Sequence, residues 1–437
     1  MKWDSIVIGG GAAGYYFALA SAKKEKQVLL IEKDLLGGTA FSTGCLPVKK
    51  MMDNLKLVKK TEFALGKGLI RGQVEKGDIF AISQKEINEY PSFLEKKLSS
   101  SGVKLLYGEA EIMDNRRVYL KGEIFEAEHI IIATGTSPKG VFETEIDGEK
   151  IISHLDLLKE KNRPDELMIL GANVEGVEFA SLLCELGTQV TLVDKEADIL
   201  PGTDADFIAT IRNQLDKHHV RYRLNKEVKQ LLTTVEGVKI IFADGTQLDG
   251  KQLLITGQRQ VNRPKTKIDF KTSSEGYFLV DENFQTSQAN IFAIGDVNGL
   301  HGMAHIAIQQ GLMLSDYLYD NKAIIKDYEK LPRCIFTLDE IAGVGLQVNQ
   351  EAGLVSKAMP LNKNLRAYHS EHADGMVKIV CRGDEVVGLW LQSIDAGNMM
   401  AASGWLLERG MLLEDLKTNL WIHPTILEAF VDALIDQ

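Results

Sequence analysis

The first two thirds of the chain alternate short apolar runs with longer amphipathic stretches. Residues 5–8 and 28–31 are apolar runs that flank a stretch of helical periodicity at 15–24. The same order returns later in the chain, at 167–170, 177–186 and 190–193. Short buried runs separated by helices are typical of parallel sheets whose strands are joined by crossover helices. The pattern therefore predicts an α/β fold that contains two similar units.

The remaining pattern predicts connecting strands and then a different domain. Apolar runs that end in small residues or an acid lie at 130–136, 253–257 and 290–296, followed by a helix over 303–320. From about residue 329 the apolar positions alternate with a period of two, which is typical of antiparallel strands. These strands are expected at 334–337, 341–346, 376–380 and 386–391, with helices at 398–409 and 426–434. We therefore predict an α+β domain at the C-terminal end.

Composition and charge narrow the function classes. With 437 residues the chain is long enough for about three domains of ordinary size. Its net charge of −11 argues against a nucleic-acid or anionic-membrane partner, since either requires a basic face. We see no signal segment and no apolar run near the roughly 20 residues of a membrane helix. The four cysteines form no C-x-x-C pair, so we expect a cytoplasmic protein without a structural metal site.

The first unit carries a dinucleotide-binding fingerprint. Gly9, Gly11 and Gly14 follow the first strand and open a helix, and Glu32 ends the next strand, 18 residues after Gly14. In such a fingerprint the glycines allow a tight turn, an approach to the pyrophosphate and close helix–strand packing. The pyrophosphate binds at the helix N-terminus and the acid binds a ribose hydroxyl. A glycine triplet alone is equally compatible with a plain turn, but the complete strand–helix–strand context favours dinucleotide binding.

The second unit repeats this design with one departure. Gly171 and Gly176 match the outer glycines, Asn173 replaces the middle one, and Asp194 follows 18 residues after Gly176. A carboxylate at position 194 repels a 2′-phosphate, so the site is expected to prefer NAD(H) over NADP(H). The side chain of Asn173 is expected to crowd the pyrophosphate and weaken binding. The alternative is a nucleotide fold that has lost its ligand.

Two further pairs of residues suggest catalytic roles, one as a reactive thiol and one as a general base. Cys45 lies between a glycine and a Leu-Pro pair, and Lys49 follows four residues later. A cysteine near a lysine, at the start of a helix expected from about Pro47, is predicted to have a lowered pKa; the alternative is a small apolar residue packed in a core. His423 precedes Glu428 by five residues, a spacing at which the carboxylate can orient the imidazole as a general base. The alternative is a histidine that caps a helix beside a solvated glutamate.

At this point the whole chain resembles the pyridine nucleotide-disulphide oxidoreductases. The resemblance is carried by the first fingerprint and by five later motifs: G-G-T-A-x4-C-x-P-x-K at 37–49, A-T-G at 133–135, A-I-G-D at 293–296, F-T-L-D-E-I-A at 336–342 and H-P-T-x-x-E at 423–428. In the motif at 336–342 the family has proline at the position of Asp339. Residues 303–305 also resemble the L-A-H segment that lies beside the flavin ring in the family.

The resemblance implies a fold, two cofactors and a homodimer. It implies two Rossmann-like three-layer (ββα) domains, with FAD bound by 1–142 and 264–326 and NAD(P) by 143–263, and a dimerisation domain at 327–437. The residues expected to bind FAD are Gly9, Gly11, Ala13, Gly14, Glu32, Lys33, Gly38, Thr39, Lys49, Ala133, Thr134, Gly135, Gly295, Asp296, Met303, Ala304 and His305. Those expected to bind NAD(H) are Gly171, Asn173, Gly176, Asp194 and Gly257.

The resemblance also assigns the catalytic residues and exposes one gap. It implies that Cys45 is the thiol beside the flavin, that Lys49 and Glu178 pair at the flavin N5, and that His423 with Glu428 is the base, acting on the other subunit. Ala40 stands where the family has its first redox cysteine, the one that attacks substrate, so no disulfide can form between positions 40 and 45. Ordinary disulfide reduction is therefore not expected.

Three functions remain open at this stage. The first is an NADH-dependent flavoprotein that reduces a small sulfur or peroxide acceptor through the single thiol Cys45. The second is an NADH:acceptor diaphorase, oxidase or quinone reductase that does not use Cys45. The third is a catalytically silent FAD-binding protein with an interaction or sensing role. Retention of the Lys49, Glu178, His423 and Glu428 side chains favours the first.

Overall fold

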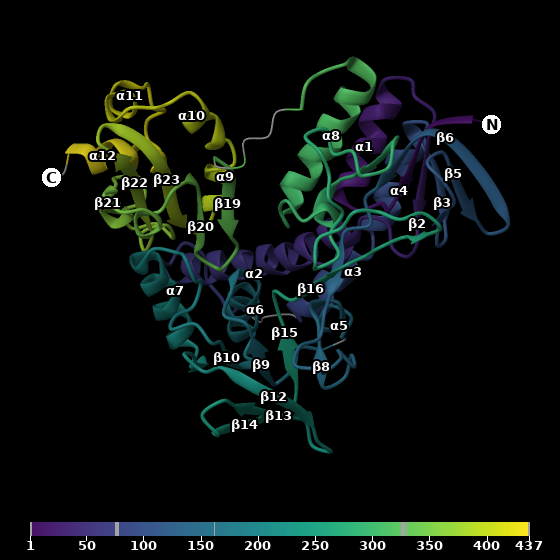
Figure 1. The fold of residues 1–437 in the computed structure, drawn as a ribbon. Coiled ribbons are helices and arrows are strands. Elements are labelled where there is room, and N and C mark those ends of the chain that lie inside the picture. Colours follow the sequence, from purple (N-terminus) through teal and green to yellow (C-terminus); the bar gives the residue numbers. More distant parts are fainter. Residues whose placement is uncertain (1, 75–77, 161, 325–327, 329, 436–437) are drawn as a thin grey trace.

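The fold is described from a computed structural model and consists of three lobes around a long central helix (Figure 1). The structure describes residues 2–74, 78–160, 162–324, 328 and 330–435. The helix α2 (Cys45–Gly66) runs across the centre, between two α/β lobes and the C-terminal lobe. The predicted fold class, two nucleotide-binding α/β units and a C-terminal α+β domain, is confirmed.

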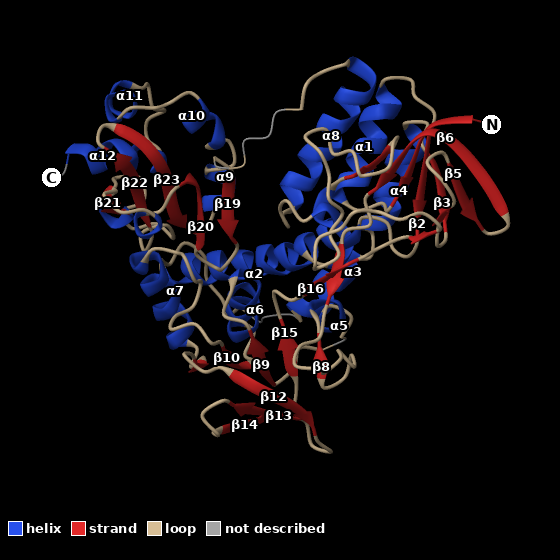
Figure 2. Ribbon diagram, viewed as in Figure 1, coloured by secondary structure: helices blue, strands red, loops and turns tan. Residues whose placement is uncertain are grey.

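The first lobe is built on a parallel sheet covered by two helices. Strands β1 (Lys2–Ile8), β2 (Val28–Glu32), β3 (Lys104–Tyr107), β6 (Glu123–Ile132) and β18 (Ile291–Ala293) pair in parallel. Helices α1 (Ala12–Lys23) and α8 (Ala304–Asp320) lie side by side over this sheet (Figure 2). Their close crossing requires a glycine, since a Cβ on Gly311 would lie 2.4 Å from the Ala13 carbonyl oxygen. Shorter elements complete the lobe: β4 (Glu111–Ile112), β5 (Arg117–Leu120), β17 (Lys265–Thr266), α3 (Ile79–Ile87), α4 (Tyr90–Ser100), and the short helices at Thr39–Thr43 and Gly295–Asn298.

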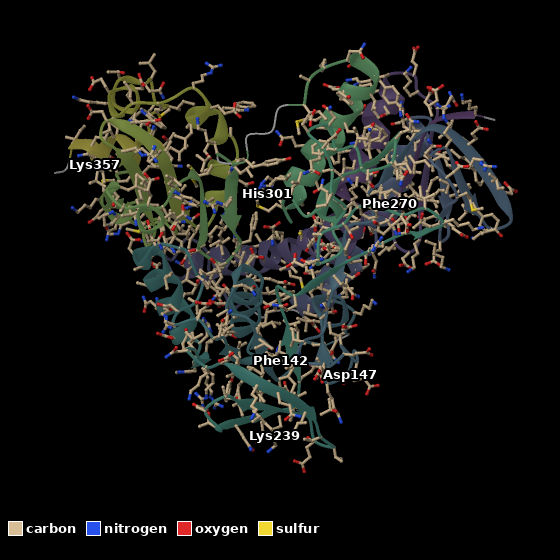
Figure 3. The ribbon with its side chains drawn as sticks, viewed as in Figure 1. Phe142, Asp147, Lys239, Phe270, His301 and Lys357 are labelled. Carbon is tan, nitrogen blue, oxygen red and sulfur yellow. The ribbon has the colours of Figure 1, made fainter. Side chains whose placement is uncertain are left out.

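The second lobe repeats the arrangement and adds a third layer. Its parallel sheet has the order β11 (Arg221–Arg223), β10 (Gln189–Val193), β9 (Glu166–Leu170), β15 (Leu253–Ile255) and β8 (Ile151–Ile152). Its helices are α5 (His154–Leu157), α6 (Val174–Glu185) and α7 (Ala205–Lys217). An antiparallel sheet of β12 (Val228–Thr233), β13 (Val238–Phe242) and β14 (Gln247–Gly250) packs through Ile240 and Phe242 against Met168 of β9. Phe142, Asp147 and Lys239 belong to this lower lobe (Figure 3).

The C-terminal lobe is an antiparallel sheet with short helices. Its strand order is β19 (Pro332–Ile335), β20 (Glu340–Gly345), β23 (Glu385–Ser393), β22 (Met376–Arg382) and β21 (Val355–Pro360). The helices are α9 (Ala396–Met399), α10 (Gly404–Glu408), α11 (Leu413–Thr418) and α12 (Ala429–Ile435), with short 3₁₀ turns at Val348–Gln350, Leu361–Lys363 and Ile426–Glu428. The continuous helix predicted at 398–409 is wrong. It is interrupted between α9 and α10 by a turn in which Ser403 N donates to the Met400 carbonyl at 2.9 Å.

The largest core cluster joins the lobes. Apolar side chains of α2, among them Met51 and Leu55, pack in one buried cluster with α6 and with Leu338 and Trp390 of the C-terminal lobe. A short antiparallel pair, β7 (Thr136–Pro138) and β16 (Arg259–Val261), also connects the two α/β lobes. The predicted domain boundaries stay predictions, and the one at 326/327 lies outside the described residues.

Candidate active site

The thiol Cys45 is the first residue of α2. The preceding segment, Thr39–Thr43, forms a single π-helical turn, and Gly44 connects it to α2. Cys45 is exposed, and it is a free thiol like the other three cysteines. Ala40 and Phe41 are partly buried against the core of the first lobe. The helix begins two residues before the predicted start near Pro47, so the thiol lies on its first turn.

An ion pair lies one turn along α2 from the thiol. Lys49 Nζ is 2.7 Å from Glu178 Oε2, and Glu178 is 7% exposed. The other carboxylate oxygen of Glu178 accepts a hydrogen bond from Phe336 N at 2.8 Å. The ammonium also lies 4.6 Å from the centre of the Phe336 ring. Glu178 thus joins residues of all three lobes beside Cys45.

The predicted lowering of the Cys45 pKa is not borne out by this geometry. Although Cys45 is exposed at the surface, nearby protein atoms still displace water from around the thiol, and this desolvation raises the pKa of Cys45 above its ordinary value. The positive charges of Lys49 and Arg259 oppose the rise, whereas the carboxylate of Glu178 adds to it. The expectation counted Lys49, the start of a helix and a neighbouring flavin, but not the desolvation and the carboxylate of Glu178, which only the tertiary structure reveals.

The first fingerprint forms an open cradle. Gly9 has a positive φ of 103°, and a Cβ there would lie 2.4 Å from the Ala133 carbonyl oxygen. A Cβ on Gly11 would meet nothing within 4 Å, and the same is true of Gly135. The carboxylate of Glu32 accepts hydrogen bonds from Gly10 N at 2.7 Å and Asp34 N at 2.8 Å. The space between these backbones fits the close approach of a dinucleotide pyrophosphate to a helix N-terminus.

Residues of the later motifs border the same cradle. Gly295 packs on α1, since a Cβ there would lie 3.0 Å from the Ala13 Cβ. Asp296 accepts a hydrogen bond from the Thr136 hydroxyl at 3.3 Å, and burial raises the pKa of its carboxyl group. Met303 is the N-cap of α8, whose first residues are Ala304 and His305. Thr134 and Asn262 bond to each other, the Asn262 amide donating to the Thr134 carbonyl at 3.1 Å. Lys33 is exposed beyond β2.

The second fingerprint repeats the position and hydrogen bonding of the acid in the first unit. Asp194 accepts hydrogen bonds from Ala172 N at 2.5 Å and Glu196 N at 3.0 Å, as Glu32 does in the first unit. Gly171 has a φ of 110°, and a Cβ on Gly176 would lie 1.8 Å from the Gly171 carbonyl oxygen. Helices α1 and α6 both begin three residues before their predicted starts, because the third glycine of each fingerprint lies inside its helix.

The histidine pair lies on the C-terminal lobe. His423 Nδ1 is 3.0 Å from Glu428 Oε1, and the other carboxylate oxygen accepts from Thr425 N at 2.5 Å. The His423–Pro424 peptide bond is cis. The His423 side chain is 74% exposed, and among the described residues its hydrogen-bonding partner is Glu428. The structure therefore brings the pair together but does not bring it to Cys45 of the same chain.

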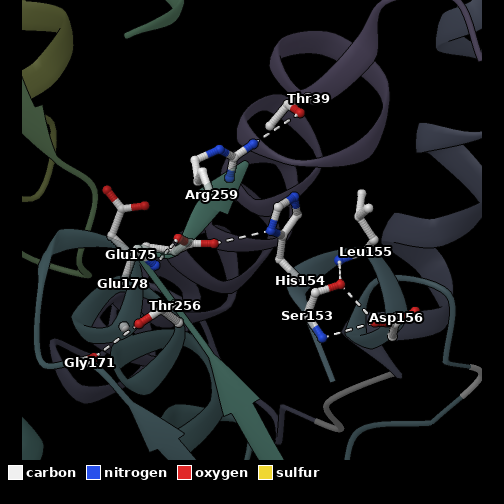
Figure 4. Close-up of polar contacts among 12 residues, drawn as sticks. Thr39, Ser153, His154, Leu155, Asp156, Gly171, Glu175, Glu178, Thr256 and Arg259 are labelled. Carbon is white, nitrogen blue, oxygen red and sulfur yellow. Dashed lines mark hydrogen bonds and ion pairs between the residues drawn. The ribbon is translucent and has the colours of Figure 1, made fainter. Parts of the chain in front are cut away.

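Sequence reasoning missed three polar residues that lie where the two α/β lobes meet. Arg259 Nε donates to the Thr136 hydroxyl at 2.8 Å, and its Nη2 lies 3.4 Å from the hydroxyl of Thr39. Figure 4 shows Arg259 above Glu175 and His154, which form an ion pair. No spacing or motif marked these side chains, because they meet only where β16, α5 and α6 converge.

Two dinucleotide cradles, a thiol with an adjacent ammonium and a separate C-terminal sheet domain define the class of flavin-dependent pyridine nucleotide oxidoreductases. The family profile described as pyridine nucleotide-disulphide oxidoreductase matches residues 3–311. The profile of that family's dimerisation domain matches residues 331–434. The chain therefore belongs to the pyridine nucleotide-disulphide oxidoreductase family. It is an oxidoreductase of a family whose members use FAD and NAD(H).

The relatives cover nearly the full length of the chain. A dihydrolipoyl dehydrogenase of Haloarcula marismortui is 28% identical over 98% of this chain and 95% of its own. Leghemoglobin reductase of Glycine max is also 28% identical, over 98% of this chain and 86% of its own. Among solved structures, LpdA of Mycobacterium tuberculosis matches with a TM-score of 0.88 and 26% identity over 99% of both chains.

The residues that the structure describes contain neither a membrane-spanning helix nor a cluster of metal-ligating side chains. No helix there combines the length and apolar character that crossing a membrane requires. Within the same ranges, no three His, Cys, Asp or Glu side chains group so as to hold a metal ion.

Proposed function

We propose that this enzyme takes hydride from NADH and passes electrons through FAD to a small sulfur or peroxide acceptor, using the single thiol Cys45. The observation that carries the proposal is the position of Cys45 on the first turn of α2, one turn before the Lys49–Glu178 ion pair. The preference for NADH over NADPH is supported by Asp194, whose carboxylate repels a 2′-phosphate.

The FAD cradle lies along the first fingerprint, from Glu32 past Gly11 and Gly135 to Asp296. FAD, when bound, supplies the two electrons that return an oxidised thiol to its reduced form. The Lys49 ammonium, fixed by Glu178, supplies a positive charge that stabilises negative charge on the reduced cofactor.

The single thiol determines which acceptors are possible. With a peroxide, the Cys45 thiolate attacks one oxygen and the O–O bond breaks, which forms a sulfenic acid and an alkoxide that takes up one proton to become an alcohol. Two electrons and two protons then return the sulfenic acid to thiol and release water. With a small disulfide, the thiolate forms a mixed disulfide and releases one thiolate, and two electrons with a proton release the second thiol. Neither route requires a second cysteine at position 40.

The proton for these steps is assigned to the other subunit of a homodimer. The dimerisation domain at 331–434 supports such an assembly. His423, oriented by Glu428, is exposed on that domain and is available to a neighbouring copy. In the proposed dimer it holds and delivers the proton at the sulfur of Cys45 of the partner subunit.

A second function, an NADH:acceptor diaphorase that does not use Cys45, is favoured by one observation. Burial raises the pKa of the Cys45 thiol, and a thiol that stays protonated near neutral pH is a poor nucleophile.

One experiment separates the two functions. The FAD-loaded protein is titrated anaerobically with NADH and with NADPH while flavin absorbance is followed, and the titration is repeated with Cys45→Ser. Bleaching by NADH, with a long-wavelength band that disappears in Cys45→Ser, supports the proposal. Equal turnover of artificial acceptors by both proteins, without peroxide or disulfide reduction, indicates the diaphorase. No bleaching by either nucleotide excludes both.

A further inference from the structure

The two nucleotide-binding units differ at the N-terminus of the helix that would hold a pyrophosphate. In the first unit Gly11 is the N-cap of α1, no side chain caps the helix, and a Cβ on Gly11 would meet open space. In the second unit Asn173 is the N-cap of α6. Its Oδ1 accepts a hydrogen bond from Gly176 N at 3.1 Å, and its Nδ2 donates to the Thr256 hydroxyl at 3.2 Å. One of the N–H groups that would face the anion is thus already bonded within the chain.

The strand end opposite the helix shows the same contrast. A Cβ on Gly135, after the crossing strand of the first unit, would meet nothing within 4 Å. A Cβ on the corresponding Gly257 would lie 2.5 Å from Nδ2 of Asn173. The amide of Asn173 therefore fills the gap between the fingerprint and the crossing strand, which is open in the first unit.

A carboxylate satisfies a second backbone donor of this gap. Glu175 Oε2 accepts a hydrogen bond from Gly257 N at 2.9 Å, and its Oε1 lies 3.1 Å from Nδ1 of His154. Burial acts to raise the pKa of Glu175, but the contacts with His154 and Gly257 and the charge of Arg259 lower it overall, so the group is an anion. The first turn of α1 carries no acid.

His154 holds this carboxylate from a fixed position. The ring is 3% exposed, and its Nε2 has no hydrogen-bonding partner among the described residues. A Cβ on Gly44 would lie 3.5 Å from that nitrogen, so the ring is wedged between Glu175 and the start of α2 (Figure 4).

Glu175 also lies on the route to the flavin. It precedes Glu178 by three residues on α6, so both side chains project from the same face of the helix. A dinucleotide whose pyrophosphate lies at the start of α6, and whose other end reaches Lys49, has to pass Glu175.

We propose that the side chains of Asn173 and Glu175 form an internal latch. They occupy the backbone N–H groups of Gly176 and Gly257, which would otherwise face the dinucleotide, and NAD(H) must displace these side chains in order to bind. The latch rests on the proposed function only in that NAD(H) is the ligand. The two side chains take the place of the anionic pyrophosphate at the helix N-terminus, so the nucleotide competes with groups of the protein itself. The dissociation constant for NAD(H) is therefore larger than it would be without the latch.

The test measures NAD⁺ binding to the oxidised, FAD-loaded protein by isothermal titration calorimetry. The variants are Asn173→Gly, which restores the glycine and leaves a residue that is tolerated as an N-cap, and Glu175→Ala. Glu236→Ala, an exposed carboxylate of the same lobe, is the control for the change in charge. Each latch variant is expected to bind NAD⁺ about tenfold more tightly, because the nucleotide no longer breaks an existing hydrogen bond. The control is expected to stay within about twofold of the unsubstituted protein.

Equal or weaker NAD⁺ binding by both latch variants overturns the proposal, and so does a failure of all proteins to bind. Thermal unfolding of each variant checks that the fold is kept, and either variant alone is sufficient for the comparison. The outcome is separate from that of the proposed function. Tighter binding by the variants, without any bleaching of the flavin by NADH, retains the latch and excludes the enzyme reaction.

Discussion

Replacement of Glu178 by glutamine tests how much the junction of the three lobes depends on one charge. Glutamine keeps the volume and can still accept the hydrogen bond from Phe336 N, which is 2.8 Å from Glu178. It cannot form the 2.7 Å ion pair with Lys49. A hydrogen bond between charged groups contributes about 1.5–3 kcal/mol, so we expect Glu178→Gln to lower the free energy of unfolding by about 2 kcal/mol. Glu178→Leu also leaves Phe336 N unpaired, and the expected loss rises to about 3–5 kcal/mol.

The pH dependence of this loss has a definite sign. Burial acts to lower the pKa of Lys49, but the Glu178 carboxylate holds it above its ordinary value of 10.5. The stabilisation is therefore fully present below that value and is lost as the pH rises through the raised pKa. In Glu178→Gln the lowering by burial is the largest effect that remains on the pKa of Lys49, so the variant gains stability as Lys49 loses its proton. The difference between the two proteins should narrow from pH 7 to pH 10.

The assay is urea unfolding at one protein and FAD concentration, followed by far-UV circular dichroism. Glu282→Gln, an exposed carboxylate of the first lobe, serves as the control and should change stability by less than about 0.5 kcal/mol. If Glu178→Gln unfolds at the same urea concentration as this control, or if its deficit persists unchanged at pH 10, the assigned role of the ion pair is wrong.

Three further predictions concern single side chains. In flavin-free protein, alkylation of Cys45 by iodoacetamide, followed by peptide mass spectrometry, should accelerate only above pH 9.0. Lys49→Met should shift this acceleration to a higher pH, because Lys49 opposes the effect of desolvation on the thiol pKa. A thiol that is already reactive at pH 7 would contradict this. Ala40→Cys should remove two titratable thiols on oxidation and regain them with dithiothreitol, whereas an unchanged count would argue that position 40 does not face Cys45. Burial and the nearby Asp374 raise the pKa of Asp339 to about 6, so its ionisation costs stability above that pH. Asp339→Asn should therefore raise the free energy of unfolding at pH 8 by about 3 kcal/mol, but not at pH 4, as measured by thermal unfolding. Equal gains at both pH values would exclude the charge as the cause.

Local steric rules explain why the two fingerprints were predictable from sequence. Gly14 and Gly176 each face a backbone carbonyl at a distance that no side chain tolerates, so the glycine spacing reports a three-dimensional requirement directly. The strands before and after each fingerprint each contain a run of buried residues that is mostly apolar, and their polar or exposed residues lie mainly at the ends. The fold class followed from these two features.

Contacts between distant segments were predictable only through the family resemblance, or not at all. Lys49 and Glu178 are 129 positions apart, and nothing in their own surroundings marks them as partners. His154 and Glu175 have no counterpart in the quoted motifs, so their contact emerged only from the structure. The direction of the Cys45 pKa in the protein chain differs from the expectation, because desolvation by surrounding protein atoms depends on the folded structure and not on the neighbouring residues in the chain.

The buried cluster around α2 has a consequence for how the nucleotide gains access. Met51 and Leu55 of α2 share this cluster with side chains of the second α/β lobe and of the C-terminal lobe. Separating these lobes from α2 would therefore expose apolar surface to water. A hinge opening of the α/β lobes is therefore costly. Admission of NAD(H) is instead expected to proceed by rotation of the Asn173 and Glu175 side chains within a rigid body, on the time scale of rotamer exchange rather than of domain motion.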